Sequence, residues 1–159
     1  MVTVHIVCVG KLKEKYWQSA CDEYAKRLRP FCKFEIIELP EYRLPNDPSE
    51  AEIQAGLEAE GRKILETVGN GVCIPLCIEG KTMTSPQLAK TIEKLTLDGI
   101  SEISFVIGSS FGLWEQVKQM GKVRLSMSPM TFPHQLARVM LCEQIYRSFQ
   151  ILNHGKYHK

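Results

Sequence analysis

Two stretches of the sequence decide the fold: FVIGSSFG at residues 105–112 and RLSMSPMTFPHQLARVMLCEQIYRSFQ at residues 124–150. In each, a short apolar run typical of a buried strand leads into a loop, which is rich in glycine in the first and in Ser, Met and Pro in the second. A long amphipathic helix and the polar tail NHGKYHK, residues 153–159, follow. Two loops after strands of an α/β protein form a natural small-molecule pocket.

The rest of the chain alternates strand patterns with helix patterns. Apolar, often β-branched runs predict strands at residues 2–9, 33–39, 72–78, 102–107 and 123–125. Helical periodicity with start and stop signals predicts helices at residues 11–29, 49–68, 84–97, 113–120 and 133–152. This alternation predicts an α/β fold whose mostly parallel sheet is flanked by helices. A chain of 159 residues is expected to form a single domain, 1–159.

Three local features refine these predictions. Ser49 or Asp47 is a plausible N-cap for the second helix. Pro75 has no N–H to donate to a ladder, which favours a strand end, a bulge or an edge strand at that position. The sequence Glu79-Gly80-Lys81 predicts a turn after the third strand.

Composition excludes several protein classes. Hydrophobic residues make up 44% and charged residues 24% of the chain, which is ordinary for a soluble globular protein. No apolar run approaches the ~20 residues that span a bilayer. The first residues resemble a strand and lack a basic n-region, so we expect no secretion signal and a cytoplasmic location. The six cysteines form neither a C-x-x-C motif nor a zinc pattern, so we expect reduced core thiols and no metal.

Charge is distributed unevenly along the chain. The net charge of +2 combines 13 basic and 16 acidic residues in positions 1–112, net −3, with 7 basic and 2 acidic residues in positions 113–159, net +5. One interpretation is a basic face near the C-terminus that meets a polyanion. The alternative is a solvated helix face.

The loops and the tail hold the candidate site residues. The turn at 108–112 lacks both the G-x-G-x-x-G and the Walker pattern, so a structural turn is as good an interpretation as a site. The loop 126–132 is apolar and carries hydroxyl groups, which suits an adenine ring, although a loop packed on the core would look similar. His134 is a helical histidine of the kind that is more often structural. Tyr157-His158-Lys159 can stack on a base and meet phosphate, or simply be an idle chain end.

Taken together, these motifs resemble a known family. VGKLKEKYW, YAKRLRP, LCIEGK, FVIGSSFG, SMSPMTFPHQLARVMLCEQIYRSF and YHK are similar, over essentially the whole chain, to the bacterial methyltransferases that modify N3 of a pseudouridine in large-subunit ribosomal RNA. That family belongs to the SPOUT class of S-adenosylmethionine enzymes. The resemblance implies a SPOUT methyltransferase fold with a C-terminal trefoil knot.

The resemblance also implies a cofactor site and an assembly. S-adenosylmethionine is expected in the knot, held by Leu76, Gly108, Met127, Ser128, Pro129, Met130, Thr131 and Phe132. A homodimer is expected, in which the last helix lies near the interface and the tail of one subunit reaches the pocket of the other. The expected substrate is pseudouridine 1915 of 23S rRNA in the assembled 70S ribosome.

The chemistry requires a group that takes the N3 proton or stabilises the resulting anion. Tyr157 and His158 are favoured for holding the base. The proton acceptor stays open among three side chains, and two arginines are candidates for electrostatic support: His158, His134 and Glu143, with Arg138 or Arg147.

The chain departs from the family pattern at Pro75, at Cys77, where an acidic residue is common, and at Ser109, where a second glycine is usual. Two other functions remain open: a SPOUT methyltransferase acting on a different rRNA or tRNA site, and a non-catalytic dimeric ribosome-binding factor.

Overall fold

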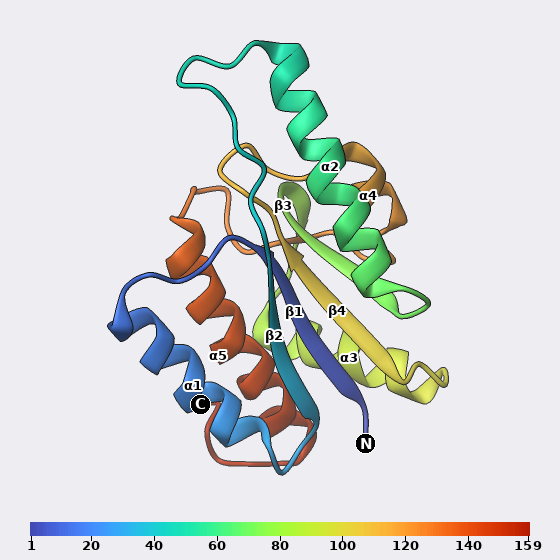
Figure 1. Ribbon diagram of the computed structural model, residues 1–159. Coiled ribbons are helices and arrows are strands. Elements are labelled where there is room, and N and C mark those ends of the chain that lie inside the picture. Colours follow the sequence, from blue (N-terminus) through green and yellow to red (C-terminus); the bar gives the residue numbers. More distant parts are fainter.

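Five parallel strands form one sheet in the computed structural model, which describes all residues 1–159. Helices lie on both faces of the sheet (Figure 1). The strands follow the order β2-β1-β4-β3-β5 across the sheet. Their bounds are β1 Thr3–Val9, β2 Lys33–Leu39, β3 Val72–Thr82, β4 Glu102–Ile107 and β5 Leu125–Ser126. The predicted α/β class and parallel sheet are therefore confirmed.

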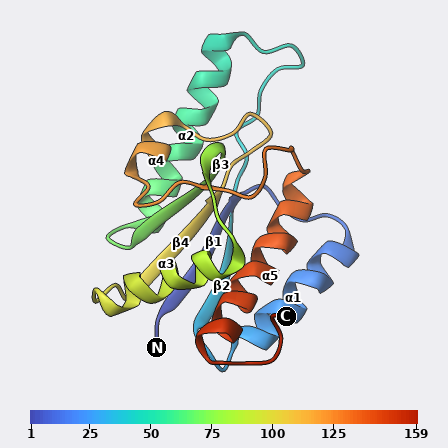
Figure 2. The ribbon, with the colours of Figure 1, turned by 180° about the vertical axis from the view of Figure 1, so that it is seen from behind.

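Five helices cover the sheet. They are α1 Lys15–Leu28, α2 Glu50–Val68, α3 Ser85–Leu97, α4 Glu115–Met120 and α5 His134–Leu152. Helix α5 packs against both α1 and α3, and these three lie together on one face, which is seen from behind in Figure 2. Helices α2 and α4 cover the other face.

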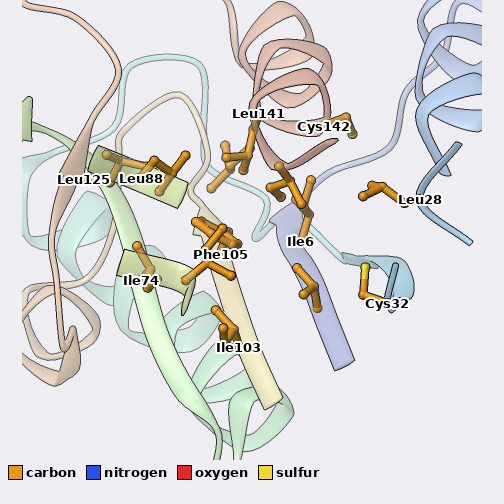
Figure 3. Close-up of a cluster of buried hydrophobic side chains, with 14 of the residues drawn as sticks. Ile6, Leu28, Cys32, Ile74, Leu88, Ile103, Phe105, Leu125, Leu141 and Cys142 are labelled. Atoms are coloured by element: carbon orange, nitrogen blue, oxygen red, sulfur yellow. The ribbon is translucent and has the colours of Figure 1, made fainter. Parts of the chain in front are cut away.

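The alternation of side chains along β1 explains the two layers. Val4, Ile6 and Cys8 point into the larger core, whereas Val7 and Val9 point into the smaller one. Figure 3 shows the larger core, where side chains of the sheet meet those of three helices. Among its buried residues are Leu28, Ile74, Leu88, Ile103, Phe105, Leu125, Leu141 and Cys142.

Local sequence signals account for two helix starts. Ser49 accepts a hydrogen bond from the Glu52 amide, and the Glu52 side chain accepts one from the Ser49 amide, so the cap predicted for α2 is a capping box. Thr84 and Gln87 make the same reciprocal pair at α3. Each box satisfies backbone donors that the first helical turn would otherwise leave unpaired.

The predicted turn at Glu79-Gly80-Lys81 is wrong, because β3 continues to Thr82. The β3–β4 ladder ends at Pro75, and β3 pairs from Leu76 onward with β5, with a register shift between Leu76 and Lys81. The Lys81 amide donates to the Arg124 carbonyl at 2.8 Å. Pro75 thus lies where the strand changes partner, as its missing N–H predicts.

Other element boundaries in the structure differ from the predicted ones by a few residues. Helix α1 starts at Lys15 rather than residue 11, α4 at Glu115 rather than 113, and β5 covers Leu125–Ser126 rather than 123–125.

All six cysteines are free thiols, and all but the half-buried Cys77 are buried, in agreement with the expected core thiols. No helix is long and apolar enough to cross a membrane. No three His, Cys, Asp or Glu side chains are grouped as metal ligands.

Candidate functional site

A cavity of about 640 Å³ lies at the carboxyl ends of β3, β4 and β5. This is the edge at which parallel α/β sheets bind ligands. The strand ends supply its apolar surface, and the two loops singled out in the sequence close around it. Of the predicted cofactor residues, those lining it are Leu76, Gly108, Met127, Ser128, Met130, Thr131 and Phe132; Pro129 is exposed and does not.

The turn after β4 is closed by its own backbone. The Gly112 amide donates to the Ser109 carbonyl at 2.9 Å, and Gly112 has φ +92°, a conformation that favours glycine. A Cβ on Gly108 would overlap the carbonyl oxygen of Gly112. Glycine at 108 is therefore required by the close approach of the two backbone segments that line the cavity.

The loop after β5 is stiffened by its serines. The Ser126 hydroxyl, which is buried, donates to the Ser128 carbonyl at 3.2 Å. The Ser128 hydroxyl in turn accepts from the Met130 amide at 2.9 Å. These short-range bonds hold the loop in a defined shape, while the Met130 side chain remains 74% exposed at the rim.

An ion pair also lines the cavity. Lys118 of α4 and Glu79 of β3 both line it, with Nζ and Oε1 2.6 Å apart. The hydrogen bond from Lys118 lowers the pKa of the Glu79 carboxyl. Burial raises the pKa of the Cys77 thiol beside it.

Glu60 supports the glycine turn from behind, and the sequence analysis missed it. Its carboxylate is buried on α2 and accepts hydrogen bonds from the Tyr42 amide at 2.9 Å and the Ser109 hydroxyl at 3.1 Å. Burial raises its pKa, because neither partner carries a compensating positive charge. Ser109, the departure from the family pattern, is thus tied to α2. The available signal was Gly61, at which a Cβ would collide with Trp114, indicating that this stretch of α2 is tightly packed.

The four candidates for catalysis fall in different places. His134 begins α5 and lines the cavity. Arg138, one turn further, is 2% exposed and does not line it. Its Nη1 lies 2.6 Å from Glu38 Oε2, and its Nη2 donates to the Gly10 carbonyl at 3.1 Å. The side chain therefore joins α5 to the carboxyl ends of β1 and β2.

Tyr157 and His158 lie far from the cavity of their own chain. The Tyr157 hydroxyl donates to Glu143 at 3.1 Å, and its ring packs edge-on against Tyr146 with centroids 4.9 Å apart. Arg147 lies over the Tyr157 ring and within 3.2 Å of His158 Nδ1. Glu143 is nine positions beyond His134, roughly 14 Å along the helix at 1.5 Å per residue. Both ribbon views place the C-terminus beside α1, away from the loops (Figures 1 and 2).

A family model described as "Predicted SPOUT methyltransferase" matches residues 2–158, nearly the whole chain. The chain belongs to the SPOUT methyltransferase family. The cavity therefore lies where two loops of a SPOUT protein meet the ends of the strands, and the glycine turn and the Ser/Met/Pro loop are parts of that family's fold.

Several full-length relatives of this SPOUT chain are named as methyltransferases of large-subunit ribosomal RNA. Proteins called ribosomal RNA large subunit methyltransferase H from Oenococcus oeni and from Streptococcus thermophilus strain CNRZ 1066 are 47% and 49% identical to it. The alignments cover 100% of this chain and 100% of the first protein, and 98% of this chain and 99% of the second. The relative of that name from Clostridium botulinum is 47% identical over 99% of this chain and 100% of its own length.

A solved structure supports the fold. The structure of a probable methylase family protein from Haemophilus influenzae Rd KW20 matches with a TM-score of 0.59 at 14% identity, and the match covers 98% of this chain and 70% of that one. At this identity the likeness concerns the arrangement of the elements alone.

Proposed function

We propose that the chain transfers a methyl group from S-adenosylmethionine to N3 of pseudouridine 1915 in 23S ribosomal RNA, acting on the assembled 70S ribosome in the cytoplasm. The observation that carries the proposal is the full-length identity of 45–49% to proteins named ribosomal RNA large subunit methyltransferase H. Membership of the SPOUT family makes the chain an S-adenosylmethionine-dependent methyltransferase, and the relatives' name makes large-subunit rRNA its substrate.

The cavity fits this cofactor. Its volume lies within the range of roughly 300–1,000 Å³ that is typical of small-molecule sites. Its floor is apolar and its walls carry hydroxyl groups, which suits an adenosine group. Leu76 and the loop Met127–Phe132 would enclose the adenine, with Gly108 allowing close approach of the backbone. When bound, the cofactor supplies an electrophilic methyl group on its sulfonium. The protein's part is then to align the acceptor nitrogen with that methyl group and to manage the N3 proton.

The position of the tail supports a role for a second copy of the chain in that step. Each tail is held on its own α5, away from its own cavity, so we infer that Tyr157 and His158 act at the cavity of a partner. Ile78 and Met130 are 56% and 74% exposed at the rim of the cavity, which offers an apolar surface for a second subunit. We infer a homodimer whose site combines the cavity and His134 of one copy with the tail of the other.

Arg138 has a supporting role in this proposal. Its contacts with Glu38 and Gly10 fix the start of α5, and therefore His134, relative to the sheet. The C-terminal trefoil knot is also part of the proposal. The close packing of β3 on β5, where a Cβ on Gly80 would meet the Arg124 backbone at 2.9 Å, is compatible with a segment threaded tightly there.

The test is transfer of a labelled methyl group to ribosomes that lack the modification, with free rRNA and tRNA as parallel substrates. We expect label on 70S particles, mapped by mass spectrometry to N3 of that pseudouridine. Label on another rRNA or tRNA site would replace the proposed target. Calorimetry showing no binding of S-adenosylmethionine would favour a non-catalytic ribosome-binding factor.

The tail can be tested separately. Removal of residues 157–159 should abolish methylation while leaving the affinity for S-adenosylmethionine within a few fold, because the residues proposed to hold the cofactor all lie outside the tail. Full activity after truncation would remove Tyr157 and His158 from the site.

A further inference from the structure

A second hollow, of about 720 Å³, lies beside the cofactor cavity and is lined mainly by polar and charged residues. It is formed by the end of β3, the segment before β5 and the last turns of α3. Glu79 lines both hollows, so they are neighbours along the same edge of the sheet. We call this hollow the basic groove; its charged residues are Glu79, Lys81, Lys94, Asp98, Lys122 and Arg124.

The basic groove carries an excess of free positive charge. Its four cations, Lys81, Lys94, Lys122 and Arg124, are all exposed, and none is part of an ion pair. Of its two carboxylates, Glu79 is already bonded to Lys118 at 2.6 Å. Four unpaired cations thus face a single free carboxylate.

Tertiary structure brings these cations together from three parts of the chain. The Lys81 amide donates to the Arg124 carbonyl at 2.8 Å, and the Lys122 amide donates to the Cys73 carbonyl at 3.0 Å. The third part is α3, which contributes Lys94. The backbone beneath the charges is therefore fixed, although the side chains are free to adjust to a ligand.

We propose that the basic groove binds the phosphate backbone of the ribosomal RNA next to the nucleotide that enters the cofactor cavity. The inference rests on the proposed function, which supplies a polyanionic substrate. Several unpaired cations spread over an open hollow match successive phosphates better than one compact anion. The shared wall at Glu79 means that a strand lying in the groove continues directly to the cavity.

The position of Glu79 has a further consequence. A lone carboxylate between the groove and the cavity would repel phosphate. Its bond to Lys118 neutralises it, so the passage between the two hollows is not closed to an anion.

The test compares two full-length triple variants with equal loss of charge. The groove variant carries Lys94→Gln, Lys122→Gln and Arg124→Gln, and Lys81, within β3, is left unchanged. The control variant carries Lys26→Gln, Lys33→Gln and Lys63→Gln, which change exposed cations on α1, β2 and α2. Strand β2 is at the opposite edge of the sheet from β5.

We expect KM for unmodified ribosomes at about 0.15 M salt to rise roughly tenfold or more in the groove variant alone. Binding of a labelled single-stranded RNA oligonucleotide, followed by fluorescence anisotropy, should weaken in parallel. The salt slope of that binding should fall by about 2–3, because each lost phosphate contact removes roughly 0.7–0.9. The dissociation constant for S-adenosylmethionine should stay unchanged.

Several results would overturn the inference. They are equal behaviour of the two triple variants, loss of cofactor affinity along with RNA affinity, or displacement of the oligonucleotide by millimolar inorganic phosphate at constant ionic strength. Weaker binding to ribosomes with unchanged oligonucleotide binding would point to an acidic ribosomal protein instead. If the unaltered protein fails to methylate ribosomes, the proposed function fails, while the oligonucleotide measurement still decides the groove.

Discussion

At the scale of single residues, Glu60 and Gly108 show how tightly the glycine turn beside the cavity is packed. Glu60 is a carboxylate with 6% exposure and two neutral donors, and burial raises its pKa. A carboxyl whose pKa is raised on folding contributes stability below its unfolded pKa and loses that contribution as pH rises through its folded pKa. Ionisation of Glu60 therefore destabilises the turn that carries Ser109.

The first prediction is that Glu60→Gln gains stability relative to the unaltered protein as pH rises. The amide keeps an acceptor for Tyr42 and cannot ionise, so the difference in unfolding free energy should grow in its favour from the unfolded carboxyl pKa, about 4.3, upward. Urea denaturation at a series of pH values measures it. The control is Glu66→Gln, an exposed carboxylate on the same helix. A difference independent of pH would contradict the prediction.

The second prediction concerns Gly108→Ala. The added methyl group would overlap the Gly112 carbonyl, so the turn must open, and overpacking of this kind costs about 1–3 kcal/mol. Calorimetry should therefore show weaker binding of S-adenosylmethionine. Phe111→Ala, which places the same residue at an exposed position of the same turn that does not line the cavity, should bind normally. Equal affinities of the two variants would show that the turn does not contact the cofactor.

At the scale of elements, α5 contributes both to the cavity and to the position of the tail. Its first residue lines the cavity, and its middle holds the tail through Glu143, Tyr146 and Arg147. Burial, followed by the hydrogen bond to Glu143, raises the pKa of Tyr157, so the phenol stays protonated and the contact persists at neutral pH. Arg138 fixes the same helix to the sheet.

The third prediction is that Arg138→Met destabilises the fold by roughly 2–4 kcal/mol. Removing one partner of a buried ion pair costs about 3–5 kcal/mol, and Glu38, at 34% exposure, recovers part of this by hydration. Chemical denaturation measures the loss. The double variant Arg138→Met, Glu38→Gln should lose less unfolding free energy than the two single variants lose in sum. Unchanged stability of Arg138→Met would leave the residue free for a direct role in the reaction.

At the scale of the whole molecule, one chain contains a cavity and a tail that do not meet. If the reaction needs both the cavity and the tail, two copies of the chain must together form each site. In a symmetric dimer the same pair of surfaces is used twice, giving two equivalent sites.

The fourth prediction follows from that arrangement. A copy with Gly108→Val has a damaged cavity and an intact tail, whereas a copy lacking residues 157–159 has the reverse. Each should be inactive alone. After refolding together in equal amounts, half the dimers are mixed and each has one intact site, so about one quarter of the normal methylation should return. Absence of any recovery, with both copies folded and dimeric, would contradict a shared site.

The order of strands and helices and the two loops that line the cavity could be predicted from the sequence. These follow from local causes: β-branched runs, helical periodicity, caps such as Ser49, and glycine at turns that need it. The two loops that follow β4 and β5 were predicted to form the pocket because the carboxyl ends of parallel strands share one edge. Seven of the eight cofactor residues that the family resemblance implied line this cavity.

The contacts between positions far apart in the sequence could not be predicted and were found only in the folded chain. Arg138 has the pattern of a polar helix position, yet Glu38, a hundred positions earlier, makes it a buried one. The extension of β3 through Glu79 depends on β5, and the role of Glu60 depends on Ser109, 49 positions later. Local propensity contains no information on such partners, because their energies arise only once the chain has packed. The grouping of cations in the basic groove and the separation of the tail from the cavity likewise depend on how the chain packs.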